Sequence, residues 1–268
     1  MYGAAPRSSD AGPARCEQVA GAALLAFPES DRAVLVNRVL GLGLAGPVRA
    51  GELDRVLAAM TAITGRFVVA LAPHATPRRL YEDLLARGLE PGYGWMKFRR
   101  DVRPVPLSAS APVSIRRVTP DDADRFAAVV SQGFGMDTRI APYIASLAAQ
   151  DRWSCLLAWD GDEPVGAAGM FVSGDTAWLG LASTMPGHRG RGVQSALLAS
   201  RVREARRRGV RTLVSETGER RPGFPETSYR NLLRAGFEEV YVRPNLLSPV
   251  LARETAAVAT SLVEWPPR

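Results

Sequence analysis

A ten-residue segment occurs twice in this chain, and this repeat constrains the fold more than any other feature. Residues 81–90 (YEDLLARGLE) and 229–238 (YRNLLRAGFE) share a tyrosine, two leucines, a glycine and a glutamate at the same spacing. In both places the glycine follows a helical pattern and precedes a strand-like run, as a C-terminal cap does. Chance identity is the alternative, but the predicted elements on either side also agree in order. We therefore predict two related α/β units that arose by duplication.

A proline-rich stretch separates the two units. Residues 104–112 (PVPLSASAP) hold three prolines among small residues, a composition typical of an extended linker. The first 15 residues are rich in alanine, proline, serine and glycine, which predicts a loose tail. The predicted boundaries are a tail at 1–15, a smaller and degenerate unit at 16–103, the linker at 104–112, a larger unit at 113–250 and a C-terminal tail at 251–268.

The hydrophobic pattern of the larger unit predicts an α/β fold with a mixed sheet. Gly209 and Gly236 close two of its helices. The predicted elements are a strand at 113–118, helices from 120 and at 140–149, strands at 153–159, 165–172 and 176–185, a helix at 193–208, a strand at 210–216, a helix at 228–235 and a strand at 237–243. The smaller unit repeats the second half of this order, with a strand at 34–42, a helix at 51–61, a strand at 66–71, a helix at 76–87 and a strand at 92–99.

The chain carries a formal net charge of +7, and Lys97 is its only lysine, so almost all of the positive charge is arginine. Codon bias is the preferred explanation of this composition, and attraction to a polyanion or a phosphorylated cofactor is the functional alternative. The densest basic run, at 201–211, contains Glu204 and no aromatic residue for base stacking. A nucleic-acid partner is therefore not expected.

The two cysteines, Cys16 and Cys155, lie far apart and form no CxxC pair, so neither a disulfide framework nor a metal site is predicted. No apolar stretch approaches the ~20 residues of a membrane span. The apolar segment at 19–27 resembles a signal-peptide core, but Glu17 precedes it and no good cleavage site follows. We expect a cytoplasmic protein with no membrane partner.

The segment 184–198 (TMPGHRGRGVQSALL) carries the clearest chemical signal. It begins at the end of a predicted strand and opens a predicted helix, and its glycines let the backbone approach a ligand closely. The free N–H groups and the dipole at the helix start favour an anion such as a pyrophosphate. Arg189 and Arg191 add positive charge. An ordinary tight turn is the alternative for a bare GxG, and neither a Walker nor a Rossmann glycine motif is present.

This segment resembles the pyrophosphate motif Q/R-x-x-G-x-G/A of the GCN5-related N-acetyltransferases, with Arg189 and Gly192 in the fixed positions. The resemblance covers about residues 113–242, including the strand before the motif and a later helix that ends at Gly236. One departure is Gln194, which stands where the family usually has glycine or alanine. The resemblance implies an acetyl-CoA N-acyltransferase-like fold with acetyl-CoA as co-substrate and no metal. It implies that the cofactor contacts Thr184 and Met185 through pantetheine, Arg189, Gly190, Arg191, Gly192, Val193, Gln194 and Ser195 through pyrophosphate, and also Ser228 and Asn231.

The corresponding loop of the smaller unit, at 41–47 (GLGLAGP), has no arginine at the motif position, and Pro47 removes a backbone donor. We expect this unit to bind no CoA and to shape the acceptor cleft instead. A second working site is the alternative.

The resemblance also implies direct attack by the acceptor amine, with a backbone N–H near a bulge before Met185 as the oxyanion donor. A mostly protonated amine needs a base, and Glu216 at the end of its strand is the first candidate. A solvated strand-end acid is the alternative reading, and Glu219 and Glu226 are loop alternatives. Leu232 replaces the tyrosine that serves many family members as general acid. Tyr229, one turn earlier, could substitute or could be a packed aromatic residue.

We therefore expect an N-acetyltransferase that moves an acetyl group from acetyl-CoA to a primary amine of a small molecule. The alternatives are transfer to a protein N-terminus or lysine, and a non-catalytic protein that binds or senses CoA. A homodimer is left open.

Overall fold

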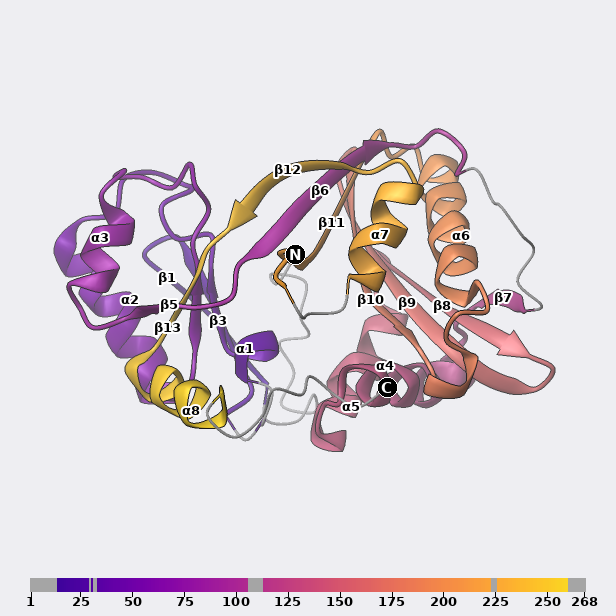
Figure 1. Cartoon of the computed structure of the whole chain (residues 1–268), viewed down its shortest axis with the longest axis horizontal. Coiled ribbons are helices and arrows are strands. Elements are labelled where there is room, and N and C mark those ends of the chain that lie inside the picture. Colours follow the sequence, from indigo (N-terminus) through magenta and orange to yellow (C-terminus); the bar gives the residue numbers. More distant parts are fainter. Residues whose placement is uncertain (1–13, 29, 31–32, 106–112, 223–225, 260–268) are drawn as a thin grey trace. The chain divides into compact units, whose positions relative to one another are not determined.

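The computed structural model describes residues 14–28, 30, 33–105, 113–222 and 226–259 (Figure 1). Most of the predicted N-terminal tail and linker, and the end of the predicted C-terminal tail, lie outside the described residues. The chain forms two compact units. One consists of the described residues of Pro13–Trp95 and Tyr241–Arg268, and the other of those of Met96–Val240. We call them the first and the second unit.

The second unit is built on a mixed seven-stranded sheet with the order β12-β6-β11-β10-β9-β8-β7. Helices α6 and α7 cover one face of it, where Leu198, Val202, Tyr229 and Leu232 share a buried cluster with Met170 and Leu179 of the sheet. The strands are β6 (Trp95–Asp101), β7 (Ser114–Arg117), β8 (Trp153–Asp160), β9 (Glu163–Ser173), β10 (Thr176–Thr184), β11 (Thr212–Gly218) and β12 (Glu238–Arg243). The helices are η2 (Pro120–Asp122), α4 (Ala123–Phe134), η3 (Thr138–Ile140), α5 (Ala141–Ser146), η4 (Leu147–Ala149), η5 (Pro186–His188), α6 (Val193–Arg207) and α7 (Thr227–Arg234).

The first unit has a six-stranded sheet with the order β1-β2-β3-β4-β13-β5. Its main core forms where Leu53, Met60 and Leu80 of α2 and α3 pack against the sheet, which contributes Val39 and Val69. The strands are β1 (Arg15–Val19), β2 (Ala22–Ala26), β3 (Arg38–Leu40), β4 (Val68–Ala70), β5 (Glu90–Pro91) and β13 (Asn245–Leu247). The helices are α1 (Ala33–Val36), α2 (Ala50–Ile63), α3 (Leu80–Leu85) and α8 (Pro249–Ala259).

The two units exchange strands. β5 and β6 are neighbours in the chain, yet β5 pairs in the sheet of the first unit and β6 in that of the second. In the same way β12 belongs to the second sheet, while β13 returns to the first and pairs with both β4 and β5. The chain passes between the sheets once between β5 and β6 and once between β12 and β13. These two crossings lie at equivalent distances from the two copies of the repeated segment. This symmetry agrees with the predicted duplication.

The prediction of a tandem α/β fold with mixed sheets is confirmed, but several local predictions were wrong. The predicted strand at 34–42 is split into the short helix α1 and the three-residue strand β3, and the partly buried Val34 of α1 packs against a cluster that includes Leu251 and Ala252 of α8. The predicted helix at 76–87 is shorter in the structure and consists of α3 alone. Its first part is a turn in which the N–H of Leu80 donates to the carbonyl of Pro77. The segment that resembled a signal-peptide core contributes β2 to a hairpin with β1, which turns at Ala20 and Gly21 with positive φ.

The first part of the predicted C-terminal tail lies in helix α8 (Pro249–Ala259). In α8, Leu251 and Ala252 are buried against Val68 and Leu247. Among the helices that the structure describes, none combines the length and the apolar character needed to cross a bilayer.

Candidate active site

The central feature of the second unit is a point where two parallel strands part. β10 and β11 pair from Thr176 opposite Thr212 to Leu179 opposite Ser215, and their ladder ends there although both strands continue. At the same place β10 shifts its register against β9 between Gly180 and Ser183. We call this place the divergence point. Backbone groups beyond it are not tied into a ladder between β10 and β11, so a ligand can pair with them.

The bulge in β10 is held by a buried arginine. Leu181 has φ +51°, a left-handed conformation that costs energy for a residue with a side chain. Arg201 of α6 donates from Nη1 to the carbonyl oxygens of Gly169 at 3.2 Å and Gly180 at 3.3 Å. Burial lowers the pKa of Arg201 to about 10, so the guanidinium stays charged at neutral pH. The bulge is therefore fixed by a cation on its first carbonyl.

A glycine-rich turn joins β10 to α6. After η5, Gly190 (φ +75°) and Gly192 (φ +81°) adopt left-handed conformations, and Gly192 is the N-cap of α6. Within the described part of the chain, no acceptor is found for the backbone N–H groups of residues 190–195. We call residues 189–195 the anion nest. Unpaired donors at the start of a 15-residue helix attract a negatively charged group.

The nest is anchored by close packing of α6 on β9. Val193 is 2% exposed, and a Cβ added to Gly166 of β9 would lie 2.7 Å from its Cγ1. Gly166→Ala is therefore expected to cost about 1–3 kcal/mol of stability, because neither the strand nor the first turn of α6 can yield easily. Chemical denaturation measures this. Gly187→Ala, where the added Cβ meets nothing within 4 Å, is the control and should stay within about 0.5 kcal/mol of the parent.

The side chains of the nest are oriented by neighbours. Arg191 Nη2 lies 3.3 Å and His188 Nε2 3.4 Å from Asp160 Oδ2, and Arg189 Nε donates to the carbonyl of Thr184 at 3.4 Å. Gln194 does not fill the nest, since its Oε1 accepts a hydrogen bond from Asn231 Nδ2 at 2.6 Å.

That bond ties α7 to the start of α6, and Figure 1 shows these helices next to each other. Ser228 is exposed at the start of α7. Thr184 pairs with Gly166 of β9, and the N–H of Met185 donates to the carbonyl oxygen of Val165 at 2.9 Å. The backbone N–H of Met185, one of the predicted cofactor contacts, is therefore already paired within the sheet.

Glu216 is the acid at the divergence point. It directly follows Ser215, the last β11 residue paired with β10, and its side chain is 7% exposed. Lys97 Nζ of β6 forms an ion pair with Glu216 Oε2. The other two candidate acids lie in the loop before α7 and pair with arginines, Glu219 with Arg221 at 2.7 Å and Glu226 with Arg230 at 3.1 Å. Lys97 carried no sequence signal of a site except that it is the only lysine.

Tyr229 is packed inside the second unit. Its ring meets Phe98 edge to face at 4.9 Å, and its hydroxyl donates to Glu239 Oε1 at 2.6 Å. Burial, together with the bond to Glu239, raises the pKa of Tyr229 to about 12. Leu232, at the place of the family tyrosine, is 6% exposed in the same core.

Tyr229→Phe separates a packing role from proton donation. Because the hydroxyl is committed to Glu239, we expect kcat to stay within about threefold of the parent, whereas loss of a general acid would cost about 10²–10⁴-fold. The lost hydrogen bond should lower stability by about 1–2 kcal/mol. Steady-state kinetics and denaturation of the same preparation measure both, and a large fall in kcat would identify Tyr229 as the acid.

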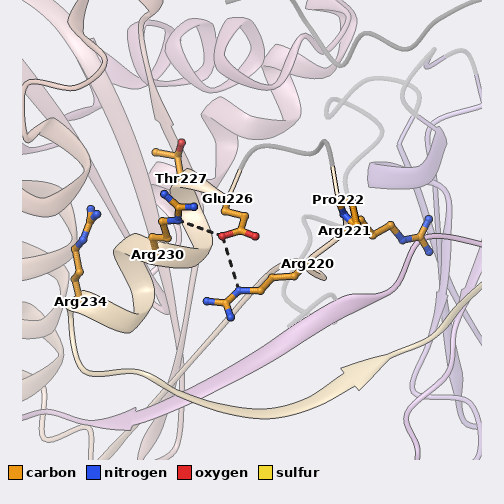
Figure 2. A pocket seen from close by; sticks show the side chains of 7 residues that line it. All are labelled: Arg220, Arg221, Pro222, Glu226, Thr227, Arg230 and Arg234. Atoms are coloured by element: carbon orange, nitrogen blue, oxygen red, sulfur yellow. Dashed lines mark hydrogen bonds and ion pairs between the residues drawn. The ribbon is translucent and has the colours of Figure 1, made fainter.

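A basic pocket of about 520 Å³ lies beside the start of α7 (Figure 2). Figure 2 shows Glu226 between Arg220 and Arg230, with Arg234 further along the helix. Its lining is Arg220, Arg221, Pro222, Glu226, Thr227, Arg230 and Arg234. Four arginines against one glutamate make this surface attractive to anions. Within the described residues, no group of three or more His, Cys, Asp and Glu side chains is arranged to hold a metal.

A mixed sheet with a divergence point, a bulge and an anion nest defines a domain of the acyl-CoA N-acyltransferase type. Residues 126–222 match the family model of the acetyltransferase (GNAT) family. The larger unit thus contains a GNAT domain, as its motif predicted. No curated protein matches the sequence significantly.

Solved structures resemble the chain over both units. A GCN5-related N-acetyltransferase from Kribbella flavida is 16% identical, with 88% of this chain and 90% of that chain covered and a TM-score of 0.61. A tandem GNAT protein from the clavulanic acid biosynthesis pathway is 17% identical, with 84% and 78% covered and a TM-score of 0.59. A GCN5-related N-acetyltransferase from Sphaerobacter thermophilus is 20% identical, with 85% and 79% covered and a TM-score of 0.57. These likenesses show the fold, and their extent supports a degenerate GNAT repeat in the first unit.

Proposed function

We propose that this protein is an N-acetyltransferase that uses acetyl-CoA to acetylate a primary amine of a small molecule. The observation that carries the proposal is the placement of a buried carboxylate, Glu216, at the divergence point of a GNAT domain that also has an intact anion nest. Acetyl-CoA supplies an activated acyl thioester. The donors of residues 190–195 fit its pyrophosphate, and the part of β10 beyond Leu179, which no longer pairs with β11, fits an extended amide-containing arm.

In the proposed reaction the acceptor amine attacks the acyl carbon directly. Glu216 takes the proton that the amine must lose, and its position beside β10 keeps it near the reacting atoms. Backbone N–H groups of the bulge at Leu181 and Ala182 are the donors proposed for the oxygen that gains negative charge. A thiol has a pKa of about 8.5, so the leaving thiolate does not require a tyrosine at position 232.

The small amine is preferred over a protein acceptor because the Glu216 side chain is only 7% exposed. A compact substrate can approach so buried a carboxylate more closely than a folded protein can, since a folded protein presents only an extended side chain or terminus. The cytoplasm is the proposed compartment.

A CoA-binding protein without turnover is the second candidate, and Leu232 in place of the family tyrosine favours it. Calorimetric titration with acetyl-CoA, followed by a thiol-release assay over a panel of small amines and lysine-containing peptides, separates the possibilities. Binding with release for small amines supports the proposal. Binding without release supports the second candidate, and absence of binding contradicts both.

A further inference from the structure

We propose that Lys97 is a positioning residue of the acyl-transfer site, which holds the Glu216 carboxylate at the divergence point. This inference rests on the proposed function, in which Glu216 is the base. In this inference β6, which lies in the first half of the sequence, completes a site whose other residues lie in the second half.

The geometry supplies the first argument. β6 lies next to β11 in the sheet, on the side away from β10. From there Lys97 reaches Glu216, and the two side chains are 22% and 7% exposed. A glutamate has three rotatable side-chain bonds, and an ion pair with a residue of the neighbouring strand limits the positions that its carboxylate samples. An ion pair away from bulk solvent restricts that freedom more than an exposed pair does.

Composition supplies the second argument. Lys97 is the only lysine among 34 lysine and arginine residues, so arginine provides the cation at every other position. A guanidinium binds a carboxylate as a planar fork that engages both oxygens, whereas an ammonium acts as a compact point charge. A base must keep an oxygen available for the proton of the amine. A lysine that engages Oε2 suits this requirement better than the fork of an arginine does, which accounts for a lysine at this one place.

The repeat supplies the third argument. At the repeat spacing, Lys97 corresponds to Asn245 on the exchanged strand β13. Asn245 pairs with Ala70 of β4, which occupies in the first sheet the place that β11 has in the second. In the first unit the exchanged strand β13 therefore pairs with its neighbour without an ion pair like that between Lys97 and Glu216. Strand exchange itself does not need the ion pair, and the pair occurs in the unit that has the anion nest.

The test compares Lys97→Met, Glu216→Gln and the double variant in the full-length protein. We expect Lys97→Met to lower kcat by about tenfold or more, since small misplacements of catalytic groups have such effects, while the Kd for acetyl-CoA stays within about twofold. If Lys97 acts only through Glu216, the double variant should be no less active than Glu216→Gln, within about threefold. The double variant also removes both charges of the pair together, so it serves as the folding control.

A chemical rescue completes the test. In a Cys16→Ser background, Lys97→Cys treated with 2-bromoethylamine regains a side chain of nearly lysine length and charge. Cys155 is 2% exposed, and burial raises the pKa of its thiol to about 12, so it should not react. We expect alkylation to raise the kcat of Lys97→Cys at least about fivefold. Such a rise would recover much of the kcat that is lost when Glu216 is no longer held in position.

Full kcat in Lys97→Met, failure of the rescue, or a further large loss in the double variant would overturn the inference while the wild type remains an active enzyme. A wild type that binds acetyl-CoA but acetylates no amine overturns the proposed function itself, and this inference with it.

Discussion

Glu216→Gln should lower kcat for acetyl transfer by about 10²–10⁴-fold, the range that loss of a general base typically produces. Glutamine has nearly the same shape and can still accept a hydrogen bond from Lys97, but it cannot take a proton from the amine. The Kd for acetyl-CoA should stay close to that of the parent, because the anion nest lies on the turn after β10 and not on β11. Thiol release at saturating acetyl-CoA and calorimetry measure the two quantities.

The matched controls are Glu219→Gln and Glu226→Gln. Both acids lie in the loop that follows β11, and both form ion pairs with nearby arginines. Exposed or half-exposed pairs contribute about 0–1 kcal/mol, so we expect kcat within about threefold of the parent. Equal loss in Glu216→Gln and a control would show a general effect of charge. An unchanged kcat in Glu216→Gln would remove Glu216 from the mechanism and would direct attention to the acceptor's own protonation.

Local signals explain why much of the second unit was predictable from the sequence. Gly209 and Gly236 follow α6 and α7 with positive φ, as C-terminal glycines do, and the long apolar runs of β8 and β9 are buried strands. The anion nest was predictable because its glycines, its arginines and the helix start lie within one short segment.

The strand exchange left no local signal. β13 has three residues, and its partner β4 lies about 175 positions earlier in the chain, so pairing is decided by the sheets and not by nearby residues. The contact of Lys97 with Glu216 spans 119 positions for the same reason. Likewise the bond between Asn231 and Gln194 shows why a larger side chain is tolerated in the motif, which spacing alone could not reveal.

One fact in the sequence could nevertheless have drawn attention to Lys97, which is the only lysine of the chain. What the sequence lacked was the sheet order, which places β6 directly beside β11. Once that order is known, an isolated lysine at the edge of the repeat becomes part of the site.

Gly192→Val should weaken acetyl-CoA binding by about 30-fold or more, which corresponds to about 2 kcal/mol. Gly192 has φ +81° at the N-cap of α6, and a β-branched residue there costs about 1–3 kcal/mol or forces the turn open. An opened turn no longer aims the N–H groups of the anion nest at one point. Arg189→Ala should have a smaller effect, about threefold to fivefold, since an exposed arginine contributes about 1 kcal/mol or less.

Gly174→Val is the matched control for Gly192→Val. Gly174 also has a left-handed backbone, with φ +60°, and an added Cβ would meet nothing within 4 Å in the turn between β9 and β10. It should therefore lose a similar amount of stability and keep its affinity for acetyl-CoA. Calorimetry and denaturation of both variants separate strain from binding. If both variants bind acetyl-CoA as the parent does, the glycine turn is a structural connection and the cofactor site must be sought elsewhere, first at the basic pocket beside α7.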